Sequence, residues 1–205
     1  MKLIFATNNQ HKIDEINAAL ANTSIEIITL KDAGIANDIP EPYPTLEENA
    51  KNKSRTIYEL TQTNPIAAGC FSEDTGLEVN ALNGDPGVRS ARYAGDEKSF
   101  DKNIEKLLRK LEGNNNRNAR FRTVISLIVD GKELVFEGIC NGTIIHARRG
   151  ANGFGYDPVF VPDGAIHTFA EMNMDEKNRF SHRRKAVDKL VTYLSTVKAE
   201  QNPKT

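Results

Sequence analysis

Two adjacent carboxylates, Glu73 and Asp74, are the side chains in this sequence best placed to do chemistry. They follow an apolar run, residues 66–71, that is typical of a buried strand, and the sequence predicts a backbone turn at Thr75-Gly76 before a second, alternating run begins at Leu77. Neighbouring acids repel one another, and a bound cation would relieve that repulsion. A solvated acidic turn explains the same residues, so the rest of the chain has to decide between the two interpretations.

A polar segment between the first predicted strand and the first predicted helix could bind phosphate. Residues 3–6 are typical of a short buried strand, and apolar residues then recur at helical spacing from Ile13 to Leu20. A loop that enters a helix offers free backbone N–H groups and the positive end of the helix dipole to an anion. Helix capping explains the polar side chains nearly as well, because the segment has no glycine. Its residues are Thr7, Asn8, Asn9, Gln10, His11 and Lys12.

A proline-rich segment, residues 38–44, carries Glu41 and predicts a loop or a sheet edge. Thr45 and Glu48 form a capping-box pattern at the start of the next predicted helix, which gives Glu48 a structural role. Lys53 falls on the apolar stripe of that helix. It lies either at the edge of a buried cleft or along the core surface with its ammonium group in water.

Two later segments could bind a flat, electron-rich ligand. Residues 150–158 combine three glycines with Phe154 and Tyr156, which suits either a loop that stacks on a ring or a tight loop pinned to the core. Ser181 is a natural N-cap for a helix with apolar residues over 186–194. His182 and Arg183 then lie in the first turn, where positive charge opposes the helix dipole, so an electron-rich partner would account for them.

The elements that must position these residues predict an α/β fold. A strand over 25–29 completes a strand-helix-strand unit, and a helix is expected around 104–111. Residues 121–129 and 133–140 are typical of a hairpin, and a turn at Asn141-Gly142 predicts a third antiparallel strand over 143–147. We therefore expect a long twisted mixed sheet flanked by helices, with two lobes and a central cleft. The expected organisation is a single domain over residues 1–198, followed by a polar tail, 199–205.

Composition narrows the functional class. The chain has 205 residues, 27 basic and 28 acidic side chains and a formal charge of −1, which does not favour a nucleic-acid partner. Cys70 and Cys140 lie in apolar runs without ligand spacing, which predicts buried thiols in a reducing compartment. No segment has the length of a signal peptide or a membrane span, so we expect a cytoplasmic protein with no membrane partner.

Five motifs in this order make the chain resemble one known family, the Ham1-type inosine/xanthosine triphosphate pyrophosphatases. The resemblance runs nearly from end to end. It departs from the family pattern at Asn8, where many members have glycine, at Glu73 and Thr75, and at Arg89, where an aromatic residue is common. The motifs are Thr7 to Lys12, Glu73 to Leu77, Pro86 to Tyr93, Phe154 to Pro158, and Ser181 to Arg183.

The resemblance implies Mg²⁺-dependent hydrolysis of non-standard purine nucleoside triphosphates (ITP, dITP and XTP) to the monophosphate and pyrophosphate, by a cytosolic homodimer. It makes Asp74 the catalytic acid/base and a Mg²⁺ ligand, and we take Glu41 as the second metal ligand, with Glu48 and Glu73 as alternatives. It also implies that His182 and Arg183 donate hydrogen bonds to the purine O6, which adenine lacks. The substrate-binding residues it implies are Thr7, Asn8, Asn9, Gln10, His11, Lys12, Lys53, Thr75, Phe154, Gly155, Tyr156, Asp157, Lys177, His182 and Arg183.

Two other classes compete with this reading. A non-catalytic purine-nucleotide-binding module could use the same loops, but it would not need Asp74 beside a metal. A carboxylate-pair enzyme acting on sugars could use the acids, but it would leave Lys12 and Lys53 unexplained.

Overall fold

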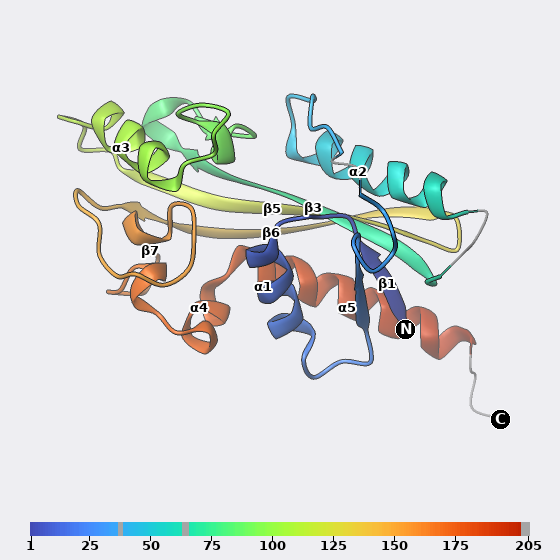
Figure 1. Cartoon of the computed structure of the whole chain (residues 1–205). Coiled ribbons are helices and arrows are strands. Elements are labelled where there is room, and N and C mark those ends of the chain that lie inside the picture. The colour runs from blue at the N-terminus through green and yellow to red at the C-terminus, as the bar shows by residue number, and fades with distance from the viewer. Residues whose placement is uncertain (37–38, 63–65, 202–205) are drawn as a thin grey trace.

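A mixed β-sheet organises the chain. The computed structural model describes residues 1–36, 39–62 and 66–201, and within this part seven strands form one sheet in the order β2-β1-β3-β5-β6-β7, with β4 paired to β3 (Figure 1). The β1-β2 and β1-β3 pairs are parallel and the remaining pairs antiparallel, which confirms the mixed sheet. The strands are β1 (Lys2–Phe5), β2 (Glu26–Thr29), β3 (Gly69–Val79), β4 (Pro86–Gly87), β5 (Asn118–Val129), β6 (Lys132–Ile144) and β7 (Phe160–Pro162).

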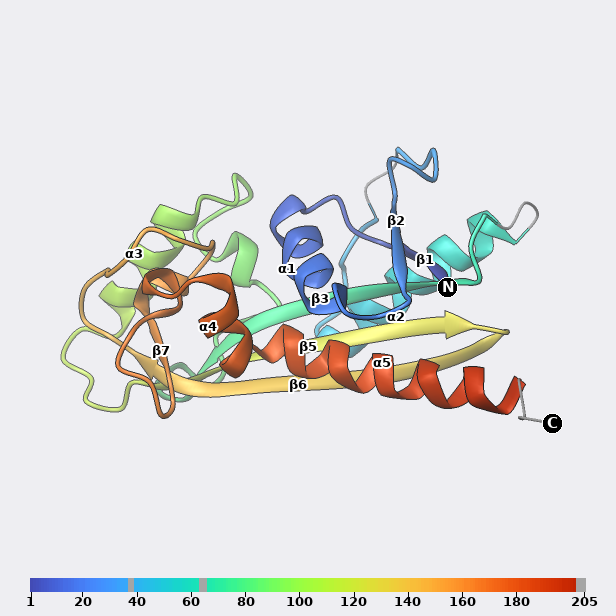
Figure 2. The same ribbon diagram turned by 90° about the horizontal axis from the view of Figure 1, so that it is seen from below.

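Helices cover both faces of the sheet. Helix α2 lies on one face, against β3 and β5, and α5 lies on the other face, against β5 and β6, with α1 beside it (Figures 1 and 2). α3 and the short α4 lie toward the end of the sheet that carries β7. The helices are α1 (Gln10–Leu20), α2 (Leu46–Thr61), α3 (Phe100–Lys110), α4 (Met174–Phe180) and α5 (His182–Gln201).

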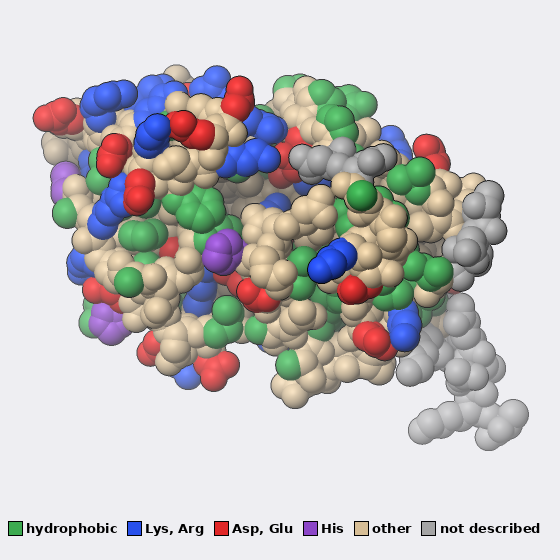
Figure 3. Space-filling view, in the orientation of Figure 1, with side chains coloured by type: hydrophobic (Ala, Val, Ile, Leu, Met, Phe, Trp, Pro, Cys, Tyr) green, Lys and Arg blue, Asp and Glu red, His purple; other side chains and the backbone are tan. Residues whose placement is uncertain are grey.

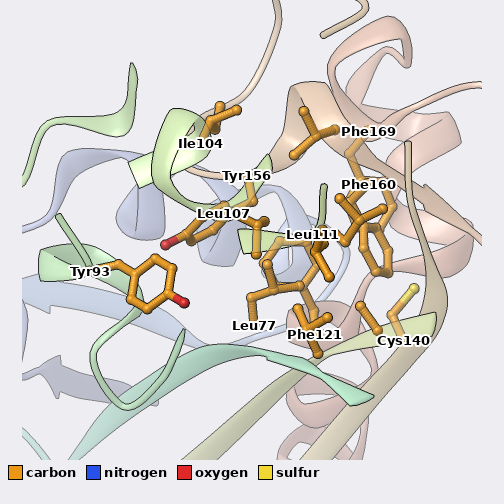
Figure 4. Close-up of a cluster of buried hydrophobic side chains, with 14 of the residues drawn as sticks. Leu77, Tyr93, Ile104, Leu107, Leu111, Phe121, Cys140, Tyr156, Phe160 and Phe169 are labelled. Atoms are coloured by element: carbon orange, nitrogen blue, oxygen red, sulfur yellow. The ribbon is translucent and has the colours of Figure 1, made fainter. Parts of the chain in front are cut away.

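The long strands β3, β5 and β6 connect two groups of elements. At one end, α3, β7 and the segments around them enclose a buried cluster that includes Leu77, Phe121 and Phe160 (Figure 4). At the other end, β1, β2, α1 and α2 pack around the sheet, with Phe5 stacked on Phe71 at 4.5 Å between ring centroids. This arrangement confirms the expected α/β class with helices flanking the sheet.

Strand β3 directs its two acids to opposite faces of the sheet. Successive side chains of a strand alternate between faces. Ser72 donates to the Ala50 carbonyl in α2, and Asp74 shares that face, whereas Glu73 points to the other face and pairs with Arg183 at the start of α5. The pleat therefore separates the two adjacent carboxylates.

Two turns predicted from glycine are wrong, because β3 continues through Thr75-Gly76 and β6 continues through Asn141-Gly142. Both glycines allow the backbone of a neighbouring strand to approach closely. A Cβ on Gly76 would lie 2.6 Å from the Gly87 carbonyl oxygen, and one on Gly142 would lie 2.3 Å from the Val161 carbonyl oxygen. The strand expected over 143–147 is accordingly wrong, and β6 pairs instead with β7.

Several local predictions are confirmed. Thr45 caps α2 by accepting from the Glu48 N–H at 3.2 Å, and the Ser181 hydroxyl accepts from the Arg184 N–H at 3.2 Å at the start of α5. Both cysteines are buried free thiols, and burial raises the pKa of each to about 12.

The predicted tail and proline-rich segment are described only in part. α5 extends to Gln201, so the tail expected from residue 199 begins as helix. Residues 202–205 and the first residue of the proline-rich segment, Asp38, lie outside the described residues. In the described part of the chain, no helix combines the length and apolarity needed to cross a bilayer.

Candidate active site

A cavity of about 680 Å³ opens between the two ends of the sheet, within the usual size range of small-molecule sites. The space-filling view shows this face hollowed, with basic and acidic side chains around the hollow (Figure 3). The cavity walls come from the β1-α1 loop, α2, β3, the segments before α3, the 154–157 loop and the start of α5. Of the residues predicted from sequence, those that line it are Thr7, Asn8, Asn9, Lys12, Glu41, Lys53, Asp74, Thr75, Phe154, Gly155, Tyr156, Asp157, Lys177, His182 and Arg183.

Asp74 lines this cavity, and one of its carboxylate oxygens has no hydrogen-bond partner among the described residues. Its Oδ1 accepts from the Thr75 N–H at 3.0 Å and lies 3.8 Å from Lys53 Nζ. Its Oδ2 is buried and has no hydrogen-bond partner within the part of the chain that the structure describes. Burial raises the pKa of Asp74, although the charge of Lys53 opposes that rise. A buried, unsatisfied carboxylate oxygen is costly, which points to a partner supplied by a ligand or a cation.

Lys53 lies inside the cleft, buried, and not along the outer core surface. Its Nζ is 2.5 Å from Glu41 Oε1 and donates to the Glu73 carbonyl at 2.7 Å. Burial alone would raise the pKa of Glu41, but the Lys53 ammonium lowers it. Arg92 lies 3.4 Å from the other oxygen of the same carboxylate. Glu41 is therefore an ionised carboxylate on the same side of β3 as Asp74.

The β1-α1 loop presents a helix start to the cavity. Asn9 caps α1 by accepting from the Lys12 N–H at 3.3 Å, and the Asn9 N–H donates to the Thr7 hydroxyl at 3.2 Å. Gln10 and His11 are exposed and do not line the cavity. Gln10 donates to Asp14 at 2.8 Å, and the His11 ring stacks on Phe154.

An ion-pair cluster forms part of the cavity wall, through Lys12, Lys177 and Arg183. The Arg183 guanidinium donates to both oxygens of Glu73, at 2.6 and 2.9 Å, and also pairs with Glu15. Lys12 reaches Glu73 at 3.0 Å, and Lys177 reaches Glu15 at 2.6 Å. Burial would raise the pKa of both acids, yet the cations lower that of Glu15 to about 2 and hold that of Glu73 well below its usual range.

Asp157 ties this cluster to the aromatic loop. Its Oδ2 accepts from Lys177 at 2.6 Å and from the Phe154 N–H at 2.9 Å. Gly153 is required beside it, because φ is +74° and a Cβ there would lie 2.1 Å from that oxygen. The loop is therefore held both by a turn that needs glycine and by a buried charge.

Aromatic and imidazole rings form the other end of the cavity. His182 is buried and stacks on Phe121 with 4.7 Å between ring centroids. Burial, and next the charge of Arg183, lower the pKa of His182 well below its usual value, so its imidazole is neutral. Its Nδ1 is a second buried atom with no partner among the described residues. Tyr156 donates to the Ser90 carbonyl at 2.9 Å, which fixes the inner end of the aromatic loop.

The three carboxylates proposed from sequence as the second metal ligand lie in different surroundings. Glu73 points to the opposite face of β3 from Asp74, where it pairs with Arg183 and Lys12, and Glu48 is exposed and accepts from Thr45 at 2.7 Å. Only Glu41 among the three shares the cavity with Asp74.

The donor set fits Mg²⁺. Within the described ranges, no group of three or more His, Cys, Asp or Glu side chains gathers as a cation cage. Mg²⁺ is typically held by one or two carboxylates, with substrate phosphates and water completing its shell. Asp74, with its unpartnered Oδ2, and Glu41 offer this kind of partial shell.

Sequence reasoning missed several residues that build the site. Glu15 is the most important, since it neutralises Arg183 and Lys177 from the buried face of α1. A signal was present, because an acid lies within the apolar stripe of that helix, three residues after Lys12. Cavity residues that were not predicted as site residues include Phe100 and Phe121, and also Ser90 and Arg92, which lie within the Pro86 to Tyr93 motif.

The cavity of this open mixed sheet brings together a helix N-terminus, buried cations, a carboxylate oxygen without a partner among the described residues and an aromatic wall. These features define an α/β protein whose site suits a phosphorylated ligand with a flat ring. A model of the Ham1 family matches residues 3–193. The chain belongs to the Ham1 family.

Individual relatives agree with this assignment. The dITP/XTP pyrophosphatase of Flavobacterium johnsoniae is 48% identical, over 97% of this chain and 100% of its own length. That of Porphyromonas gingivalis is 47% identical, over 96% of this chain and 99% of its own. The Ham1 protein of Staphylococcus aureus (38% identity, TM-score 0.83) and a HAM1 protein from Coxiella burnetii (34% identity, TM-score 0.85) share the fold, each over 96% of this chain and 99% of its own.

Proposed function

We propose that the protein hydrolyses the non-standard purine nucleoside triphosphates ITP, dITP and XTP to the monophosphate and pyrophosphate, with Mg²⁺. Full-length relatives named dITP/XTP pyrophosphatases support this reaction. The observation that carries it is the buried, unpartnered Oδ2 of Asp74, a residue that lines the same cavity as the buried cations and the aromatic loop.

The phosphate end of the site comprises the α1 N-terminus, Lys12 and Lys53. Backbone N–H groups and two ammonium groups there would hold the triphosphate by charge and hydrogen bonds. Mg²⁺, when bound by Asp74 and Glu41, supplies further neutralisation of the phosphate charge. Asp74 is the candidate to accept a proton from the attacking water, because one oxygen of its buried carboxylate has no partner among the described residues.

The base end discriminates through a fixed donor. Four Arg183 contacts already engage Glu73, Glu15 and Thr75, whereas His182 Nδ1 is uncommitted. A neutral imidazole carries one N–H group. With its hydrogen on Nδ1, the imidazole would donate a hydrogen bond to the O6 of hypoxanthine or xanthine. Adenine presents an amino group at that position, which leaves two donors facing each other. Phe154 would stack on the purine.

The proposal includes a cytoplasmic homodimer with one domain over residues 1–198. The main alternative, a non-catalytic purine-nucleotide-binding module, shares every binding feature of the cavity. It provides no reason to bury an unpaired carboxylate oxygen at the phosphate end.

The test is to incubate the protein with ITP, ATP or GTP, with and without Mg²⁺, and to identify the products by ion-exchange chromatography. We expect IMP and pyrophosphate from ITP, dependent on Mg²⁺, with ATP turned over far more slowly because adenine lacks O6. Orthophosphate as the first product would mean cleavage of the terminal phosphate. Binding of ITP without any product would favour the binding module.

A further inference from the structure

Three rings from separate segments meet at the mouth of the cavity. His11 lies in the first turn of α1, Phe100 begins α3, and Phe154 belongs to the glycine-bounded loop. The His11 and Phe154 rings are stacked, with 4.9 Å between centroids and 11° between planes. Phe100 is tilted against both, at 6.2 Å from His11 and 6.1 Å from Phe154.

The two faces of the Phe154 ring have different surroundings. Lys177 Nζ and Arg183 Cζ lie 5.4 and 5.7 Å from its centroid, and both residues are buried cavity residues. Phe100 and Phe154 line the cavity, whereas His11 is exposed and is not among the described residues that line it. His11 therefore stacks on Phe154 from outside the described cavity lining, whereas Lys177 and Arg183 approach the same ring from among the cavity residues.

The backbone of the loop is fixed, but its aromatic side chain needs a second support. Asp157 accepts from the Phe154 N–H at 2.9 Å and so holds the main chain. That contact does not fix the plane of a half-buried ring. The parallel imidazole of His11 does, because a stacked pair resists tilting of either ring.

We propose that His11 is a positioning residue that holds the Phe154 ring parallel to the substrate purine, so that purine, Phe154 and His11 form a three-ring stack. This inference rests on the proposed function and deepens it. His11 itself does not touch the reacting atoms. It acts on the base end of the site although its helix serves the phosphate end.

The test compares His11→Ala with His11→Phe, which keeps a stacking ring, and with His167→Ala, which removes an exposed imidazole elsewhere. Steady-state KM and kcat are measured for ITP with Mg²⁺, together with the inhibition constant of inorganic tripolyphosphate, which has no base. A thermal melt by circular dichroism confirms that each variant is folded.

We expect His11→Ala to raise KM for ITP roughly 2- to 12-fold, the effect of losing one aromatic stack. The kcat and the tripolyphosphate inhibition constant should stay unchanged, and His11→Phe and His167→Ala should behave as wild type. A KM that is unchanged or lower in His11→Ala would overturn the inference. So would an equal rise in the tripolyphosphate constant, or a His11→Phe variant as impaired as His11→Ala.

Failure of the proposed function gives a different result. If the wild-type protein does not hydrolyse ITP, the proposed function is wrong and this inference falls with it. If the wild-type protein hydrolyses ITP and the variants do not separate as described, only the role of His11 is wrong.

Discussion

Replacing Glu73 by glutamine removes one negative charge from the buried ion-pair cluster while keeping the size of the side chain. The side chains of Glu73 and Arg183 are 0% and 2% exposed. Three cations, on Lys12, Lys177 and Arg183, face the three carboxylates of Glu15, Glu73 and Asp157, so the formal charges balance. In Glu73→Gln, Arg183 would keep Glu15 as its carboxylate partner, and the cluster would carry an uncompensated positive charge.

Removing one partner of a buried pair costs about 3–5 kcal/mol, because the remaining charge stays buried. For a chain of this size that corresponds to a fall in Tm of roughly 6–20 °C. The matched control is Asp188→Asn, which breaks the exposed pair of Arg184 and Asp188, 2.7 Å apart with side chains 37% and 54% exposed. An exposed pair of this kind contributes about 0.3–0.5 kcal/mol.

The assay is urea-induced unfolding followed by circular dichroism, with both variants measured beside the wild type. The free energy of unfolding should fall several-fold more in Glu73→Gln than in Asp188→Asn. If the two variants lose the same small amount, below about 1 kcal/mol, the cluster is not the buried and tightly paired unit described above.

Three further predictions follow from other residues. The pKa of Glu15 is lowered from 4.5 to about 2, so its ionised side chain contributes fully to stability above a pH of about 4.5, and this contribution is lost as the pH falls toward about 2. Glu15→Gln should therefore flatten the dependence of the unfolding free energy on pH in that window. An unchanged dependence would contradict the pairing of Glu15 with Arg183 and Lys177. Glu41→Gln should raise the Mg²⁺ concentration that gives half-maximal ITP hydrolysis, whereas Glu59→Gln, at an exposed position, should not. If both variants need the same Mg²⁺ concentration, Glu41 is not a metal ligand. Gly153→Ala should weaken ITP binding and lower Tm, because φ is +74° and the new Cβ would meet Asp157; calorimetric binding equal to wild type would show that the loop adapts.

The sequence predicted the elements well where periodicity was strong and failed where glycine was ambiguous. Strand, helix and cap signals located β1, α1 and α2, because hydrophobic spacing reports directly on burial. The sequence predicted turns at Gly76 and Gly142. In the structure, each lies against the backbone of a neighbouring strand, whose position depends on residues far away in the chain. Local sequence does not distinguish a turn glycine from one that permits close approach.

The sequence predicted which residues belong to the site better than it predicted how they are arranged. The motifs contained most of the residues that line the cavity, including Asp74, Phe154 and His182. They did not reveal that Glu73 and Asp74 point to opposite faces, since adjacency along the chain suggests proximity and the pleat reverses it. Glu15 was missed because its role depends on long-range partners in α4 and α5.

The most direct test of the central claim is Asp74→Asn, compared with the wild type for pyrophosphate release from ITP by ³¹P NMR and for ITP binding by equilibrium dialysis. The substitution keeps the shape of the side chain and removes the oxygen that can take a proton. The account predicts a loss in turnover of roughly 10²- to 10⁴-fold or more with ITP binding largely retained. Asp74→Asn that releases pyrophosphate at the wild-type rate would contradict it.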